Sequence, residues 1–204
     1  MTRPHIEALL FDLGGVLIDI HAERVLEHWG RCAGVSVDFL RSRFEVDEAY
    51  RQHERGERDA CGYFAALRDR LGIAISDEDF LTGWNAMLGD EKPGVRALLD
   101  RAVRVYPLYL FSNTNAAHHA VWSRALGSLL QPFQRQFVSS EIRLRKPEPQ
   151  AFLHVADAME TAPQNVLFFD DVLENINGAR AVGMQTVHVR SSQDIADALA
   201  LLIP

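Results

Sequence analysis

From Pro93 onward the chain alternates between strand-like and helix-like segments, and this alternation restricts the fold more than any other feature. Short apolar runs of strand length are separated by longer segments with apolar residues at helical spacing. Such a pattern predicts a parallel sheet with helices on both faces, which is the doubly wound, Rossmann-like α/β class. The expected strands cover residues 6–11, 105–111, 137–139, 166–169 and 186–189, and the expected helices residues 94–104, 116–130, 149–159 and 173–181.

A segment of different character follows the first expected strand. Residues 22–88 contain short amphipathic stretches punctuated by glycines, the last of them predicted as a helix over 77–88, and no convincing strand pattern. We therefore predict an α/β core domain from residues 1–20 and 89–204, and an inserted all-α helical-bundle cap domain from residues 21–88. An insert of roughly 65 residues is small for an independent domain but suits a lid.

The composition describes an ordinary water-soluble protein and excludes several functional classes. The 204 residues are 48% hydrophobic and 24% charged, with a net charge of −7, which argues against a nucleic-acid binder. Residues 1–6 lack an apolar signal region, and no apolar stretch approaches the ~20 residues needed to cross a bilayer. We expect a cytoplasmic monomer or homodimer with no membrane contact.

The two cysteines, Cys32 and Cys61, are too few and too isolated in the sequence for a disulfide framework or a zinc site. We expect both to be reduced thiols that are largely buried. A catalytic role for either cysteine is not indicated.

Polar side chains stand at the ends of the predicted strands or in the loops just beyond them. Ligands of doubly wound sheets bind at the carboxyl ends of the strands, where the strand order reverses. If the strand at 166–169 lies beside the strand at 6–11, the acids that follow these two strands meet across that crevice. The polar groups are Asp12, Ser112 with Asn113, Lys146 before Pro147, and the pair Asp170-Asp171.

Each of these groups alone has an ordinary explanation, such as a helix cap or a surface charge. Together, a carboxylate nucleophile, a hydroxyl with an amide, a cation and a pair of acids provide the groups needed for phosphoryl transfer through an aspartate. Three converging carboxylates repel one another unless a cation lies among them, and Mg²⁺ prefers such oxygen ligands. Gly14 and Gly15 permit a sharp turn that leaves a backbone carbonyl beside Asp12.

The motifs resemble those of the haloacid-dehalogenase-like hydrolase superfamily, and the resemblance covers essentially the whole chain. It implies that Asp12 is the nucleophile, that Ser112 and Lys146 are the other catalytic groups, and that Asp170 and Asp171 bind metal. The segment between the first and second motifs looks like the helical cap of the subfamily with small all-α caps. The metal ligands implied for Mg²⁺ are Asp12, the Gly14 carbonyl, Asp170 and Asp171.

Three stretches, at 11–14, 52–57 and 112–115, are similar to those of bacterial α-D-glucose-1-phosphate phosphatases. The resemblance implies a small phosphorylated metabolite as substrate, such as the sugar phosphate α-D-glucose 1-phosphate. The residues expected to bind it are Ser112, Asn113 and Lys146 at the strand ends, and His53 and Glu54 on the rim of the lid.

One position departs from the family pattern. Most phosphatases of this superfamily carry a second Asp two residues after the nucleophile as the general acid and base, and here that position is Gly14. General acid–base help contributes about 10²–10⁴-fold, so its loss predicts slow turnover unless another group substitutes. His53, Glu54 or Asp19 could supply that group.

Two alternatives remain open at this stage. A 2-haloacid dehalogenase would use the same Asp12 nucleophile, and enzymes of that branch also lack the second Asp. They need no Mg²⁺, however, so this alternative does not explain the cluster of Asp12, Asp170 and Asp171. A catalytically weakened phosphate-binding protein would also account for Gly14. The mechanism that we favour is Mg²⁺-dependent hydrolysis of a phosphate ester in two steps, through an aspartyl-phosphate.

Overall fold

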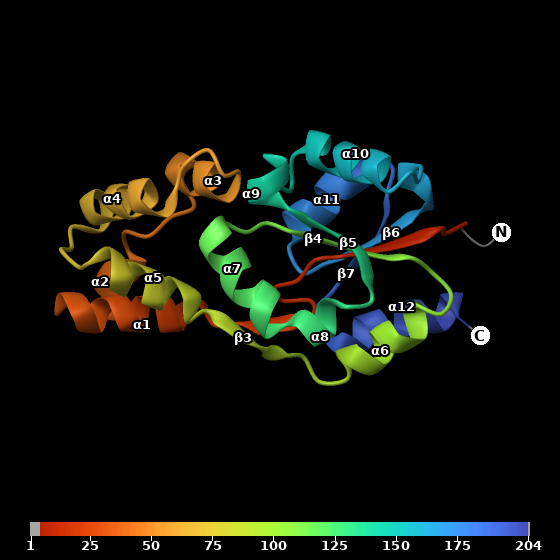
Figure 1. The fold of residues 1–204 in the computed structure, drawn as a ribbon, viewed down its shortest axis with the longest axis horizontal. Coiled ribbons are helices and arrows are strands. Elements are labelled where there is room, and N and C mark those ends of the chain that lie inside the picture. The colour runs from red at the N-terminus through yellow and green to blue at the C-terminus, as the bar shows by residue number, and fades with distance from the viewer. Residues whose placement is uncertain (1–4, 204) are drawn as a thin grey trace.

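The computed structural model describes residues 5–203 and is built around a five-stranded parallel sheet with helices on both faces (Figure 1). The strand order is β5-β4-β1-β6-β7, so the chain winds outward in both directions from β1. This confirms the predicted doubly wound α/β class. The strands are β1 (Ala8–Phe11), β4 (Leu108–Ser112), β5 (Phe133–Val138), β6 (Val166–Asp170) and β7 (Gln185–His188).

Both faces of the sheet are buried, because successive side chains of a strand point to opposite faces. Leu9 and Phe11 of β1 pack in one apolar cluster, and Ala8 and Leu10 pack in another on the opposite face. The first cluster is covered by α6 (Val95–Ala102), α7 (Ala116–Ala125), α8 (Gly127–Leu130) and α12 (Ser192–Leu202). The second is covered by α9 (Ser139–Ile142), α10 (Pro149–Ala158) and α11 (Leu173–Ala181).

Five further helices share an apolar cluster of their own, on the left of Figure 1. Aromatic rings dominate this cluster, and Trp29 stacks on Trp84 with ring centroids 5.6 Å apart. We call these helices the cap, and the predicted boundaries at residues 21 and 88 stay a prediction. The cap helices are α1 (Ala22–Ala33), α2 (Val37–Arg41), α3 (Glu48–Glu54), α4 (Ala60–Leu71) and α5 (Asp77–Asn85). Within residues 5–203, no helix has the length and apolar character needed to cross a membrane.

A two-stranded antiparallel sheet forms both connections between the cap and the core. It pairs β2 (Ile18–Ile20) with β3 (Leu88–Glu91). The prediction of a helix over residues 77–88 was wrong at its end, because α5 stops at Asn85 and a strand begins three residues later. The sequence Leu-Gly-Asp-Glu has little strand character of its own, so β3 forms through its distant partner and not through local preference.

The fifth strand of the sheet is also longer than predicted. Residues 137–139 were expected, but β5 begins at Phe133, and Ser139 already starts α9. The missed residues Gln134 and Arg135 are exposed on a strand at the edge of the sheet, where polar side chains obscure an apolar pattern.

Both cysteines are exposed, which contradicts the expectation that they are largely buried. Cys32 lies near the end of α1 and Cys61 in the first turn of α4. Amphipathic spacing indicated that these segments are helical, but it did not identify the face that each cysteine occupies.

Two of the contacts between the cap and the core show how the cap is held above the strand ends. The Ser139 hydroxyl lies 2.7 Å from the carbonyl oxygen of Glu54, where α3 meets α9. On α7, His118 Nε2 lies 2.9 Å from the Trp84 carbonyl oxygen of α5, and the two rings stack. Because a carbonyl oxygen only accepts, the Nε2 atom of His118 carries the proton.

We predict that the His118 contact makes the stability of the protein depend on pH. Burial lowers the pKa of His118 to about 4, so the unfolded chain binds a proton more readily than the folded one. The stabilisation is therefore complete above the ordinary histidine pKa and is lost as the pH falls through about 6.5 toward 4. When the pH is lowered from 7 to 5, the free energy of unfolding measured in urea should fall by about 2 kcal/mol more for wild type than for His118→Gln.

His154→Gln is the matched control, because His154 is exposed on α10. This variant should keep the pH dependence of the wild type. Equal pH dependence in His118→Gln and wild type would contradict the prediction.

Candidate active site

The register of the sheet places the first and fourth polar motifs side by side. Phe11 of β1 pairs with Phe169 of β6, and the Asp12 backbone N–H donates to the Phe169 carbonyl at 2.9 Å. Carboxylate oxygens of Asp12, Asp170 and Asp171 lie within 4.8 Å of one another. The predicted meeting of these acids follows from β6 lying beside β1, at the point where the strand order reverses.

Lys146 inserts a buried positive charge between two of these acids. Its Nζ atom lies 2.7 Å from Asp12 Oδ1 and 2.7 Å from Asp170 Oδ2, and the side chain has no exposed surface. Phe111 and Phe168 flank the ammonium group, with ring centroids 5.3 Å and 5.4 Å from Nζ. Burial opposes the charge, but the two carboxylates raise the pKa of Lys146 above its ordinary value, so the ammonium form is retained.

Asn113 holds the backbone of Lys146 by two hydrogen bonds. Its Nδ2 atom donates to the Lys146 carbonyl at 2.8 Å, and the Lys146 backbone N–H donates to its Oδ1 atom at 2.9 Å. This use of the Asn113 side chain was not predicted from the sequence, where Asn113 was expected to bind substrate. Ser112, at the end of β4, is buried and lines the same cavity as Asp12.

The two adjacent acids have different surroundings. Asp170 is fully buried and accepts hydrogen bonds from the Val172 backbone N–H, from Asn175 and from Lys146. Asn175 contacts Asp170 and not Asp171, with its Nδ2 atom 3.0 Å and 3.1 Å from the two Asp170 oxygens. Asp171 is half-buried and lines the cavity, and burial followed by the charge of Asp170 raises its pKa.

The glycines after Asp12 shape the site in different ways. Gly15 has a φ of 76°, and a Cβ atom there would lie 2.1 Å from Asp171 Oδ2, so only glycine lets the turn approach this carboxylate. A Cβ atom at Gly14 would lie 3.0 Å from Ile20 Cδ1. The apolar Ile20 side chain of β2 therefore occupies the space in which a side chain at position 14 would begin.

The electrostatics of the acid cluster fit a hard divalent cation. Burial, together with the neighbouring charges of Asp170 and Asp171, raises the pKa of Asp12 to about 7 against the opposing effect of Lys146. A single ammonium group therefore leaves the three carboxylates incompletely compensated. Converging carboxylate oxygens are the ligand type that Mg²⁺ prefers, and an ion among them would favour their charged forms.

A cavity of about 880 Å³ lies above these acids, between the strand ends and the cap. Its core side includes Asp12, Ser112 and Lys146, and its cap side includes Glu54. Glu54 Oε2 accepts a hydrogen bond of 2.8 Å from Arg145 Nε and forms an ion pair with Arg145, whose Nη2 atom also lies 2.8 Å away. Burial raises the pKa of Glu54, and Arg145 opposes that change.

Two residues considered from the sequence do not line this cavity. His53 is buried, its Nδ1 atom lies 2.9 Å from the Arg58 carbonyl oxygen, and its ring stacks on Tyr63 at 4.7 Å. Asp19 is not part of the cavity wall either, although its neighbours Ile18 and Ile20 are. Arg145 was missed, because a basic residue in a loop before Lys-Pro has no local mark that distinguishes it from a surface charge.

Comparisons with known proteins agree with this geometry. A sequence model described as haloacid dehalogenase-like hydrolase matches residues 6–183. D-ribitol-5-phosphate phosphatase from Bacteroides thetaiotaomicron is 21% identical over 97% of this chain and 98% of that protein. The chain is also similar to a crystal structure of a haloacid-dehalogenase-family enzyme from the same organism, a variant in complex with magnesium and inorganic phosphate. The TM-score is 0.84 and the identity 26%, and the match covers 95% of this chain and 98% of that one.

The fold is shared more widely. A 2-haloacid dehalogenase from Pseudomonas syringae has a TM-score of 0.66 and 23% identity, covering 97% of this chain and 99% of that one. This likeness concerns the arrangement of the chain and not its chemistry.

We predict that Lys146→Met lowers the free energy of unfolding by about 3–5 kcal/mol, because it leaves two buried carboxylates without their cation. Chemical denaturation at pH 8 in the presence of a chelator measures this loss without shielding by a divalent ion. Arg190→Met is the control, since it breaks an ion pair whose arginine side chain is 77% exposed and should cost about 0.5 kcal/mol or less. Similar losses in the two variants would show that Lys146 is not needed to compensate the acids.

Proposed function

The chain belongs to the haloacid dehalogenase-like hydrolase family, and from this premise we propose that it is a Mg²⁺-dependent phosphatase that acts on a small phosphorylated metabolite. The observation that supports this most directly is the convergence of Asp12, Asp170 and Asp171 within 4.8 Å, at a cavity that Ser112 and Lys146 also line. A similar enzyme of the same family has been crystallised with magnesium and inorganic phosphate.

Asp12, Asp171 and the Gly14 carbonyl would hold Mg²⁺, with help from Asp170. The Asp170 oxygens already accept hydrogen bonds from Lys146, Asn175 and the backbone, so Asp170 contributes mainly by fixing the cluster. When bound, Mg²⁺ neutralises charge on the phosphate oxygens and draws the phosphate group to the strand ends.

Asp12 is the nucleophile in the first step. Its Oδ1 atom accepts a hydrogen bond from Lys146, so Oδ2 is the oxygen available to attack phosphorus. The new Oδ2–P bond forms as the bond from phosphorus to the ester oxygen breaks, which yields an aspartyl-phosphate and the free alcohol. Lys146 supports this step because it favours the charged form of Asp12 in a buried position.

Ser112 and Lys146 hold the oxygens of the transferring group, where negative charge accumulates. Water then attacks phosphorus, breaks the Asp12–phosphate bond and regenerates the carboxylate. The cap excludes bulk water from the cavity during these steps.

Glu54 is the best placed of the candidates for proton transfer. Gly14 cannot carry a proton and Ile20 fills the space beside it, whereas Glu54 lines the cavity and has a pKa raised by burial. A carboxyl group with a raised pKa can protonate a leaving alcohol and later accept a proton from the attacking water.

The cap side of the cavity favours a substrate with several hydroxyl groups. Tyr50, Arg51 and Glu54 of the cap line it, Arg145 of the core lines the cavity beside them, and all four can hydrogen-bond hydroxyls. A phosphorylated sugar or polyol matches these groups and the cavity volume. α-D-glucose 1-phosphate, to whose phosphatases the motifs are similar, is one candidate, and D-ribitol 5-phosphate, by analogy with the relative, is the other.

We predict that Asp12→Asn lowers Mg²⁺-dependent phosphate release by a factor on the order of 10⁴ or more, because an amide cannot form the aspartyl-phosphate. The measurement is phosphate release from glucose 1-phosphate, glucose 6-phosphate and ribitol 5-phosphate, with Mg²⁺ and with a chelator. Full activity in Asp12→Asn would refute the proposed nucleophile.

The chelator separates the phosphatase from the dehalogenase alternative. A phosphatase should lose its activity on chelation and regain it with Mg²⁺, whereas a 2-haloacid dehalogenase would release halide under both conditions. Halide release that is indifferent to the chelator would overturn the proposal.

We also predict that Glu54→Gln lowers kcat by about 10²–10⁴-fold and removes one limb of its pH profile, since the amide keeps the shape of the side chain but cannot exchange a proton. Glu57→Gln, an exposed residue three positions away, is the control. An increase in KM with an unchanged kcat and pH profile would instead mean that Glu54 only binds the substrate.

A further inference from the structure

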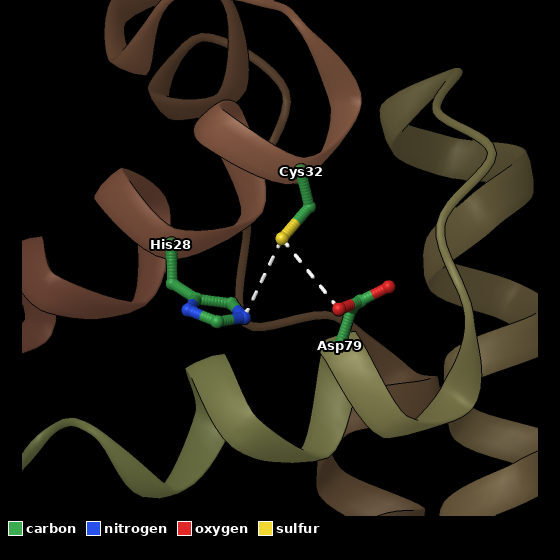
Figure 2. A group of neighbouring side chains, drawn as sticks. All are labelled: His28, Cys32 and Asp79. Atoms are coloured by element: carbon green, nitrogen blue, oxygen red, sulfur yellow. Dashed lines mark hydrogen bonds between the residues drawn. The ribbon is translucent and has the colours of Figure 1, made fainter.

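A second group of metal-ligand side chains lies in the cap, apart from the acids at the strand ends. His28 and Cys32 extend from α1 toward Asp79 on α5 (Figure 2). Cys32 Sγ lies 3.5 Å from His28 Nε2 and 3.6 Å from Asp79 Oδ1. One ligand atom from each of the three residues lies within 4.8 Å of the others, and none of the three lines the active-site cavity.

The two separations from Cys32 Sγ fit the edges of a tetrahedral zinc site. Zinc bonds of about 2.3 Å to sulfur and about 2.0–2.2 Å to nitrogen or oxygen, set at tetrahedral angles, put each of these atoms about 3.5–3.6 Å from the sulfur. The observed separations from Cys32 Sγ are 3.5 Å and 3.6 Å. Thiolate, imidazole and carboxylate together are also a donor set that favours Zn²⁺ over Mg²⁺ or Ca²⁺.

The surrounding residues orient the ligand atoms. His28 and Cys32 are four residues apart and so lie on one face of α1. Asp79 Oδ2 accepts a hydrogen bond of 2.6 Å from the Ser76 hydroxyl, and Oδ1 is the atom that faces Cys32. Outer partners of this kind fix the direction of metal ligands.

The two helices are also held close together at this point. Gly83 lies one turn after Asp79 on α5, and a Cβ atom there would be 2.5 Å from Trp29 Nε1 and 3.0 Å from His28 Cδ2. Trp29 Nε1 donates a hydrogen bond of 3.1 Å to the Phe80 carbonyl, which also joins α1 to α5. The ligand atoms are therefore positioned by the packing of the helices before any ion arrives.

We propose that His28, Cys32 and Asp79 bind one Zn²⁺ ion, with water as the fourth ligand, and that the ion cross-links α1 to α5. On binding, the Cys32 thiol releases its proton to solvent and a sulfur–zinc bond forms. The exposed position of Cys32 gives the ion access from solvent. Because the Trp84 carbonyl of α5 contacts His118 of the core, the cross-link stiffens a helix that holds the cap above the active site.

Cobalt titration tests the site without reference to enzyme activity. Co²⁺ is added to the protein in excess Mg²⁺, which fills the acid cluster at the strand ends, and thiolate-to-cobalt charge-transfer absorption is recorded. Wild type should develop this band at one equivalent, and Zn²⁺ should displace it. Cys32→Ser should lose the band, while His28→Gln and Asp79→Asn should bind Co²⁺ at least about 10-fold more weakly.

Cys61→Ser is the matched control, because Cys61 is the other exposed cysteine of the cap and lies on α4. It should keep the cobalt band, and Zn²⁺ should raise the thermal midpoint of wild type and Cys61→Ser but not of Cys32→Ser. Circular dichroism without metal checks that each variant is folded. A band that survives in Cys32→Ser, or that wild type fails to form, would mean that the three residues are only a hydrogen-bonded cluster.

Discussion

The charge of Lys146, which is completely buried, is the interaction on which the rest of the site depends. Two strand ends bring the buried carboxylates of Asp12 and Asp170 together, where their like charges repel each other unless a cation compensates them. Lys146 pairs with both carboxylates and opposes the rise that burial causes in the pKa of Asp12, and Asn113 holds the loop that carries Lys146. One cation thereby supports both the packing of β1 against β6 and the charged state that a nucleophile requires.

The cap completes the site through contacts that also limit its chemistry. Ile20 of β2 fills the space beside Gly14, so a new side chain at position 14 would first have to displace an apolar group. The proton-transfer group must then come from elsewhere in the cavity wall, and Glu54 reaches that wall because α3 is fastened to α9 through Ser139. In the proposed mechanism, substrate contact and proton transfer thus depend on the same docked helix.

The core of the fold and the convergence of its acids could be predicted from the sequence, because both follow from local patterns and one rule of topology. Apolar runs ended by polar residues located β1, β4 and β6, and the reversal of strand order at β1 placed Asp12 beside Asp170. Partnerships between distant residues could not be predicted in this way. Two examples are the hydrogen bonds from Asn113 to Lys146 and from Asn175 to Asp170. They depend on side-chain directions, which cannot be inferred from the spacing of apolar residues.

The cluster in the cap shows where this limit lies. His28 and Cys32 are four residues apart on a predicted helix, so their shared face could be inferred, but two ligands without a third do not define a zinc site. The third, Asp79, is 47 residues beyond Cys32, and it reaches them only because Gly83 lets α5 lie against α1. Cys32 and Cys61 are isolated along the chain, and the ligands beside Cys32 come from the packing of the helices and not from its sequence neighbours.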